Sequence, residues 1–249
     1  MNIVGRSNEE MRSRWVAAAL SRIPSGSRLL DAGAGEQRNR RWCKHLRYVS
    51  QDFGQYEGRG DGKGIQTGNW DTSQIDINSD ITAIPEPDAS FDAVVCTEVF
   101  EHLPDPLRAV HEFSRLLRPG GMLILTAPFC SLTHFAPYHF TSGFNRYWYE
   151  HHLAAEGFEV VEISSNGNWF HYVAQELWRL PYMGKTYSWR IGGWLALLFA
   201  LPVLAMLALL GGELDRGSNE LLSYGWHVIA RRCDAPGGLG RQNSQRPRV

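Results

Sequence analysis

The chain has 249 residues, of which 43% are hydrophobic and 20% are charged. This is the composition of an ordinary globular protein, and the length suits one domain of generous size with a full hydrophobic core. The formal net charge of -1 at pH 7 provides no general attraction to nucleic acid, so no nucleic-acid partner is expected.

The chain begins with a predicted helix and a short buried strand. Residues 8–23 place apolar side chains on one helical face, and residues 28–31 form an apolar run that ends on an acid. Gly33 and Gly35 follow, as expected where a backbone turns tightly or lets a ligand approach. A basic helix is predicted over residues 36–46. A strand, a glycine turn and a helix in this order are typical of the sheet edge at which doubly wound folds bind nucleotide-like ligands.

A second predicted strand also ends in an acid. Residues 48–52 close with Asp52, about 20 residues after Asp31, which is the offset at which a doubly wound fold places a carboxylate on a ribose. A carboxylate accepts hydrogen bonds from two vicinal hydroxyls, which no apolar or cationic side chain does. The loop over residues 54–70 is rich in glycine and ends at Trp70. It is either a surface insertion or a lid whose tryptophan packs over a ligand.

Three further strands are predicted over residues 75–78, 91–96 and 122–126. The strand over 91–96 is almost wholly apolar, as expected of a central strand that is covered on both faces. Asp105 and Pro106 have the order of a cap and a first-turn proline, so a helix is predicted to begin there. The alternation of strands and helices predicts an α/β fold with a parallel sheet between helices.

Six stretches of the chain together resemble the class I S-adenosylmethionine-dependent methyltransferases, and among them the small-molecule, type 11-like branch. These stretches are Leu29–Gly35, Asp52, Ser79–Ile81, Phe91–Val95, Glu98–Leu103 and Arg115–Gly121. No single stretch is specific for this family, but the six stretches in register over residues 29–128 are together specific for it. The resemblance implies a doubly wound, Rossmann-like sheet of seven strands and S-adenosyl-L-methionine as the cofactor.

The resemblance also implies roles for the glycine turn and the second acid. Asp31, Gly33 and Gly35 would pass under the methionine part of the cofactor, and Asp52 would bind the ribose. Gln37 departs from the family, which often has a third glycine at this position. The resemblance therefore leaves the cofactor contact at that position unassigned.

The other implied cofactor contacts follow the third and fourth strands. Asp80 would meet the adenine amino group, Ile81 would lie beside the ring, and Glu98 would lie near the methionine end. The competing ligand is a nicotinamide dinucleotide, whose fingerprint needs a glycine where this chain has the bulky Arg38. The sequence therefore favours S-adenosylmethionine.

Residues 129–152 are crowded with aromatic and histidine side chains and follow the fifth strand, where the methyl acceptor enters in this family. Transfer to a hydroxyl needs a base near neutral pH, for which histidine is the usual side chain. The candidate catalytic residues are His139 and His134, with His102 after the fourth strand as a third. The alternative is that these rings only pack against one another.

A long insertion is predicted at about residues 165–220, between a sixth strand over 157–163 and a seventh over 224–231. Its segment 191–212 has no charged residue and is long enough for a membrane span. A single crossing would separate the seventh strand from its sheet, and Pro202 is expected to kink the segment or divide it into two short helices. Three arrangements remain open: an apolar hairpin resting in a bilayer, a helix buried against the domain or a dimer partner, and a true span.

The remaining features concern location and metal binding. The four cysteines are scattered without a CxxC spacing, so neither a metal site nor a disulfide framework is expected. Reduced thiols and the lack of an apolar run after the first charged residue favour a cytoplasmic protein without a signal peptide. Residues 1–233 are expected to form one methyltransferase domain, and residues 234–249 a disordered tail.

The sequence thus predicts an enzyme that transfers a methyl group from S-adenosylmethionine to a small-molecule or lipid/polyprenyl-linked acceptor, at oxygen. Residues 191–212 are expected to contact the inner face of a membrane, and a homodimer is left open. The alternative from another class is a non-catalytic S-adenosylmethionine-binding or membrane-associated scaffold protein of the same fold.

Overall fold

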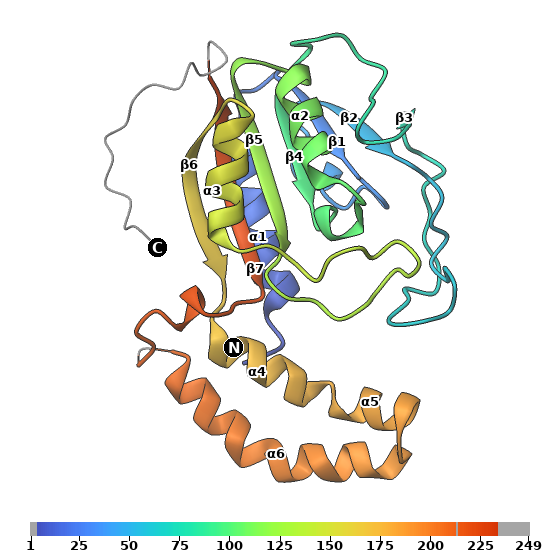
Figure 1. The fold of residues 1–249 in the computed structure, drawn as a ribbon, viewed down its shortest axis with the longest axis vertical. Helices are drawn as coiled ribbons and strands as arrows, with labels where there is room; N and C mark the ends of the chain where they lie inside the picture. Colours follow the sequence, from blue (N-terminus) through green and yellow to red (C-terminus); the bar gives the residue numbers. More distant parts are fainter. Residues whose placement is uncertain (1–3, 213, 234–249) are drawn as a thin grey trace, which may run out of the picture.

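A seven-stranded sheet forms the centre of the protein (Figure 1). The computed structural model describes residues 4–212 and 214–233, so the predicted tail lies outside the described residues. The strand order is β3-β2-β1-β4-β5-β7-β6. The strands are β1 (Arg28–Ala32), β2 (Arg47–Asp52), β3 (Ile77–Asn78), β4 (Phe91–Thr97), β5 (Leu117–Pro128), β6 (Phe158–Asn166) and β7 (Gly225–Arg232).

Strand β7 runs antiparallel to both of its neighbours, β5 and β6, whereas the other neighbouring strands are parallel. This arrangement confirms the predicted doubly wound sheet. It also means that the carboxyl ends of all strands except β7 point to one edge, where ligands of such folds bind.

Helices cover both faces of the sheet because the central strands are apolar on both sides. Helix α1 (Asn8–Ser21) packs on one face, and α2 (Pro106–Leu116) and α3 (Arg146–Ala155) pack on the other. In β4, the fully buried Val94 contacts the α2 and α3 side, and the fully buried Val95 contacts the α1 side. The Asp105 carboxylate caps α2 by accepting from the backbone N–H groups of Leu107 and Arg108, as the sequence predicted.

The predicted basic helix over residues 36–46 is wrong. Only a short 3-10 helix, Arg40–Trp42, forms there. Gln37 adopts a left-handed conformation (φ 56°), which an α-helix does not contain, and its N–H bonds the carbonyl of Ala34 in a tight turn. The glycine turn is therefore followed by further turns before β2 begins.

The insertion between β6 and β7 is helical, as predicted, and consists of α4 (Trp169–Trp178), α5 (Leu180–Tyr187) and α6 (Arg190–Leu210). It forms a separate layer beyond the carboxyl edge of the sheet (Figure 1). Helix α6 continues through Pro202 as one helix, so a division into two short helices is wrong. Leu197 and Leu204, on either side of the proline, are both buried in one apolar cluster, so both halves of α6 pack against the same group of side chains.

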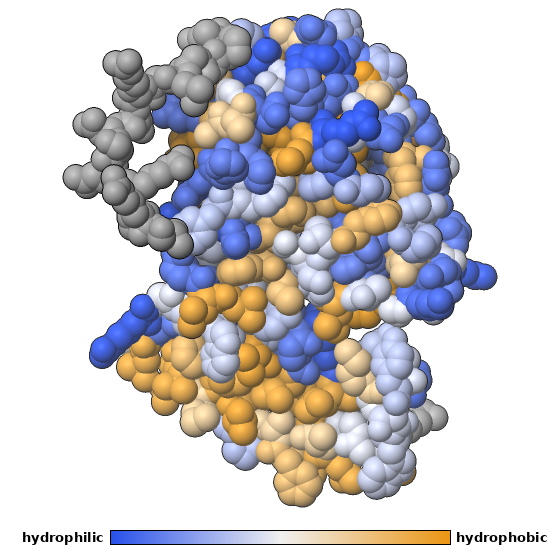
Figure 2. Space-filling model, viewed as in Figure 1, coloured by the Kyte–Doolittle hydropathy of each residue, from blue (hydrophilic) through white to orange (hydrophobic). Residues whose placement is uncertain are grey.

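Much of α6 remains exposed in this chain. Phe199 is 80% exposed, and Figure 2 shows a broad hydrophobic surface over the helical layer. Among the described residues, one helix, Ile191–Leu210, is long and apolar enough to cross a membrane by length and composition. Strands β6 and β7, which precede and follow the insertion, pair side by side, so both ends of the insertion return to the same sheet. This favours a hairpin-like insertion over a single crossing.

Candidate active site

Two cavities lie next to each other at the carboxyl edge of the sheet. The larger has a volume of about 490 Å³ and the smaller about 430 Å³. They share one wall, whose residues are Gly33, Gly35, Trp70, Glu98, His102 and Phe135. The two cavities therefore adjoin at these residues.

The glycine turn contributes two residues to the shared wall. Gly33 and Gly35 have positive φ angles of 70° and 51°, which favour glycine. A Cβ atom at Gly33 would lie 2.5 Å from Cγ2 of Val99, and one at Gly35 would lie 2.5 Å from the ring of Trp70. The lack of side chains at Gly33 and Gly35 lets Val99 and Trp70 pack directly against the turn.

Six of the seven residues predicted to contact the cofactor line the larger cavity. They are Gly33, Gly35, Asp52, Asp80, Ile81 and Glu98. The seventh, Asp31, is only 1% exposed and lies behind the turn, where it accepts hydrogen bonds from the hydroxyl of Tyr48 (2.7 Å) and the amide of Asn39 (3.2 Å). Burial raises the pKa of Asp31 to about 6, although these hydrogen bonds oppose the shift. The structure thus places Asp31 where it supports the turn.

The acids of the larger cavity have the chemistry that S-adenosylmethionine requires. The two oxygens of Asp52 accept from the backbone N–H groups of Gly35 and Gly54, each at 2.9 Å, which fixes the carboxylate at the end of β2. Each oxygen keeps a lone pair for a ribose hydroxyl. Asp80 accepts from Thr82 through one oxygen, and the neighbouring Ile81 is buried beside it, as an adenine ring with its amino group would need. The residues present therefore fit the cofactor.

Three non-glycine residues in or near the site adopt left-handed conformations: Glu98 and Phe135 line both cavities, and Gln37 follows the glycine turn. Their φ angles are 56° (Gln37), 55° (Glu98) and 55° (Phe135). Such conformations concentrate at functional sites, where surrounding contacts hold them. Gln37 adopts the conformation for which glycine is the usual residue, which explains how it replaces the family glycine. Glu98 is held by an ion pair with Arg12 (3.0 Å) and a hydrogen bond from Thr126 (2.9 Å).

The glycine-rich loop 54–70 packs against residues 133–136 and covers the site. The Asp61 N–H donates to the carbonyl of Ala136, and residues 65 and 133–135 exchange backbone hydrogen bonds, all at 3.0 Å. Trp70 lies over Gly35 and meets Phe135 edge to face at 5.3 Å between ring centroids. These contacts agree with the lid interpretation of the loop rather than with a detached surface insertion.

The three candidate histidines occupy different positions. His102 and His134 line the smaller cavity, and their ring centroids lie 4.6 Å apart. His139 lines neither cavity; its ring lies 4.9 Å from that of His134, and its Nε2 lies 3.2 Å from the hydroxyl of Ser131. The structure therefore places His102 and His134 at the smaller cavity and His139 outside both cavities.

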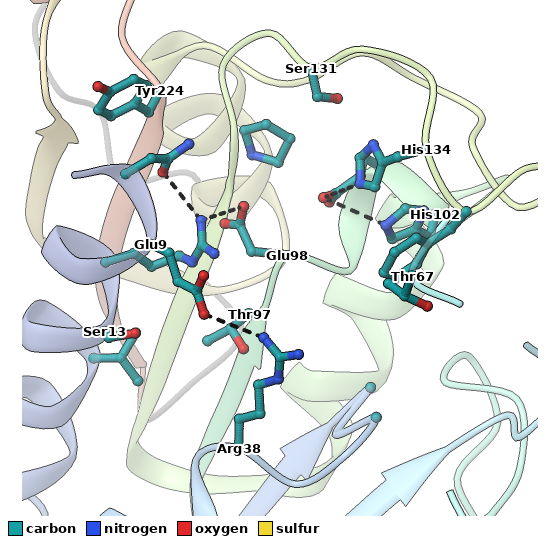
Figure 3. A pocket seen from close by; sticks show the side chains of 18 of the residues that line it. Glu9, Ser13, Arg38, Thr67, Thr97, Glu98, His102, Ser131, His134 and Tyr224 are labelled. Atoms are coloured by element: carbon teal, nitrogen blue, oxygen red, sulfur yellow. Dashed lines mark hydrogen bonds and ion pairs between the residues drawn. The ribbon is translucent and has the colours of Figure 1, made fainter. Parts of the chain in front are cut away.

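The sequence did not single out Glu101, which lies at the centre of the histidine group. Its carboxylate is 1% exposed, and its Oε1 lies 3.7 Å from Nε2 of both His102 and His134. Figure 3 shows these two rings directed at the same point. Burial lowers the pKa of His102, whereas Glu101 and other contacts outweigh burial at His134 and raise its pKa. Adjacency to His102 was the only sequence signal for Glu101, because His134 reaches it through a loop.

Comparison with known proteins agrees with this geometry. A family described as "Methyltransferase domain" matches residues 6–172. The ubiquinone biosynthesis O-methyltransferase of Alkalilimnicola ehrlichii is 56% identical over 36 residues, which are 14% of this chain and 15% of that protein. The chain thus aligns with less than a fifth of the length of such curated relatives.

Solved structures share the fold. A putative sarcosine dimethylglycine methyltransferase from Galdieria sulphuraria has a TM-score of 0.52 and 16% identity, covering 92% of this chain and 86% of that one. Phosphoethanolamine N-methyltransferase 2 of Haemonchus contortus, in complex with phosphomonomethylethanolamine and S-adenosylhomocysteine, has a TM-score of 0.52 and 15% identity. That match covers 89% of this chain and 53% of the other. At these identities the likeness concerns the fold alone.

Proposed function

This chain belongs to the methyltransferase-domain family, and from that premise we propose that it methylates an oxygen of a small or lipid-linked acceptor. S-adenosylmethionine is the methyl donor of this family. The observation that carries the proposal is the wall shared by two cavities, one with cofactor-type carboxylates and one with histidines. The short match to ubiquinone biosynthesis O-methyltransferases also supports oxygen as the methylated atom.

The larger cavity would hold the cofactor, which supplies a methyl carbon bonded to a positively charged sulfur. Asp52 would bind the ribose, Asp80 and Ile81 the adenine, and the glycine turn the methionine part. Glu98 lies on the shared wall, so the methionine end would point toward the smaller cavity. Because methyl transfer is a direct displacement, holding the two reactants in line is the main task of these residues.

The smaller cavity would hold the acceptor with its hydroxyl at the histidines. A hydroxyl becomes a good nucleophile when its proton is removed, and an imidazole lone pair is suited to this near neutral pH. His102 belongs to the shared wall and His134 lines the smaller cavity next to it, with both Nε2 atoms 3.7 Å from the same oxygen of Glu101. We assign the activation of the hydroxyl to these two rings and a positioning role to His139.

The insertion supports an acceptor that is attached to a lipid. The smaller cavity is lined by Gln175 of α4 and by Arg179, which joins α4 to α5, so the helical layer borders it directly. On α6, Trp194 and Phe199 are exposed by 63% and 80%, a density of apolar surface that marks interaction sites. A membrane at the cytoplasmic side would cover this surface and hold the tail of the acceptor while its head group enters the cavity.

The membrane contact is tested by sedimentation with vesicles of phosphatidylcholine and phosphatidylglycerol. We expect the protein to bind the vesicles and the Trp194→Glu, Phe199→Glu double variant to remain in solution. Val161→Glu is the matched control, because Val161 is also exposed (55%) but lies on β6, outside the helical layer. Equal behaviour of the double variant and the wild type would contradict membrane docking through α6.

The methylated atom is tested with a cofactor that carries a deuterated methyl group. The protein is incubated with a lipid extract in detergent, and products are identified by mass spectrometry. We expect a labelled methoxy group on a hydrophobic product. A label on nitrogen or carbon would contradict oxygen as the acceptor atom.

A further inference from the structure

We propose that Glu101, His102 and His134 bind a divalent transition-metal ion that positions the acceptor hydroxyl. The proposal rests on the proposed function for the role of the ion in the reaction, but the site itself is argued from its own geometry. Three ligand atoms, one from each residue, lie within 4.8 Å of one another.

Backbone carbonyls fix which nitrogen of each ring carries its hydrogen. His102 Nδ1 lies 2.5 Å from the carbonyl oxygen of Tyr138, and His134 Nδ1 lies 2.8 Å from that of Leu132. A carbonyl only accepts, so each Nδ1 is the donor, and a ring in its neutral form then carries its lone pair at Nε2. Histidines that bind metals typically donate their other N–H to a carbonyl or carboxylate in this way.

The two lone pairs converge on the Glu101 carboxylate. Its Oε1 lies 3.7 Å from both Nε2 atoms, which is too long for a hydrogen bond. A tetrahedral ion with bonds of about 2.1 Å separates its ligand atoms by about 3.4 Å, so these spacings suit atoms that share an ion. A proton on one ring would leave the other ring with its lone pair facing the carboxylate.

The Glu101 carboxylate has an oxygen that a bound cation would stabilise. The side chain is 1% exposed, and its Oε2 has no hydrogen-bond partner among the residues that the structure describes. A buried carboxylate oxygen without a partner is costly, and buried charges are usually paired or bound to a metal. The structure thus combines a buried charge with two oriented nitrogen ligands, which is a stronger signal than a group of exposed acids.

The three ligands indicate which ions the site would bind and whether a substrate could reach the ion. Two imidazoles and one carboxylate suit zinc, iron(II) or cobalt(II), whereas magnesium prefers oxygen ligands. Three protein ligands leave at least one coordination position for a substrate, as in catalytic zinc sites. All three residues line the smaller cavity, so the open position faces the proposed acceptor.

With the ion bound, His102 and His134 would activate the hydroxyl as ligands of the ion rather than by taking the proton directly, and the ion would bind the acceptor oxygen. Coordination lowers the pKa of the hydroxyl, which releases its proton to solvent. The oxygen then forms a bond to the methyl carbon as the bond between carbon and sulfur breaks. Sulfur keeps the electron pair, so the positive charge of the donor is neutralised and S-adenosylhomocysteine leaves. His139, whose ring is not among the three ligands, stays next to His134 as a positioning residue.

The site is tested on the full chain after removal of metals with a chelator. Zinc binding is followed by calorimetry, and cobalt(II) binding by its visible absorption bands. We expect one ion per chain and an affinity at least about 100-fold lower in Glu101→Gln and in His134→Ala. The matched control is His111→Ala, because His111 and Glu156 form a histidine–carboxylate pair of 2.9 Å on the surface. We expect this control to bind zinc like the wild type.

Two results would overturn the proposal. One is an unchanged zinc affinity in Glu101→Gln, and the other is no binding of zinc or cobalt by the chelator-treated wild type. Should the variants fail to fold, X-ray absorption of the cobalt-loaded wild type decides instead: we expect two imidazole ligands, and their absence contradicts the site.

The metal site and the proposed function can fail separately. Cofactor binding without metal binding, together with methyl transfer that a chelator does not slow, would remove the metal site and leave the function. One bound ion with no methylated oxygen product would leave the site and remove the function.

Discussion

His227 on β7 makes the stability of this protein depend on pH in a way that can be calculated from its surroundings. The ring is 4% exposed and stacks on Trp15 of α1 at 4.6 Å, and its Nε2 has no partner among the described residues. Burial lowers its pKa to about 4, and the charge of Arg12 adds to the shift, although Glu162 opposes it. The folded protein therefore holds this ring neutral under conditions in which an exposed histidine is charged.

The sign of the effect follows from proton binding. Between the ordinary histidine pKa of 6.5 and the folded value of about 4, the unfolded chain binds more protons than the folded one. The free energy of unfolding therefore falls as the pH falls through this range. The whole difference in pKa corresponds to about 3 kcal/mol of free energy of unfolding, and about 2 kcal/mol of this is lost by pH 5.

The test compares the wild type with His227→Phe by urea unfolding at about pH 7.5 and about pH 5. Phenylalanine keeps the stack on Trp15 and does not titrate, so the variant should lose about 2 kcal/mol less than the wild type between these two conditions. Asp31, whose raised pKa stabilises the folded state as the pH falls, is present in both proteins and cancels in the comparison. Equal losses in the two proteins would refute the reasoning.

Three further predictions concern the cofactor cavity and the helical layer. Gly33→Ala adds a Cβ at a positive φ and against Val99, which should displace the turn. Calorimetry should then show clearly weaker binding of S-adenosylmethionine. An unchanged affinity would contradict the role of the turn in binding the cofactor. Asp52→Ala removes the proposed ribose contact and should weaken the same binding by about tenfold or more, roughly 1.4 kcal/mol; wild-type affinity would remove the assignment. Gly193→Ala places a Cβ 2.4 Å from a carbonyl of α5 and should lower the melting temperature. The control is Gly212→Ala, whose Cβ would lie 3.5 Å from its nearest atom and should leave the melting temperature unchanged. Equal melting temperatures of the two variants would contradict the close packing of α5 on α6.

Much of the fold could be predicted because its signals are local. The strand over Phe91–Thr97 is apolar on both faces, and the capping acid Asp105 stands directly before its helix. The helix expected over residues 36–46 does not form, because a turn holds Gln37 in a left-handed conformation. The periodicity used to predict helices does not indicate such a turn. Propensity and pattern do not reveal such a conformation in a polar residue.

The candidate site was predictable only in part for a related reason. Asp52 and Asp80 follow strands directly, so the sheet itself brings them to one edge. Glu101 and His134 meet because the loop after β5 folds back under the cover formed by residues 54–70, and no spacing in the sequence encodes that contact. For the same reason, no spacing in the sequence indicates that His134 lines the smaller cavity and that His139 does not.

The central claim is that the two cavities form one site for methyl transfer to an oxygen. Its most direct measurement is the transfer of a labelled methyl group from S-adenosylmethionine to extracted lipids by the wild type and by Asp52→Ala, with product analysis by mass spectrometry. We expect a labelled methoxy product from the wild type and much less from the variant. A wild type that binds S-adenosylmethionine yet yields no methylated oxygen would contradict it.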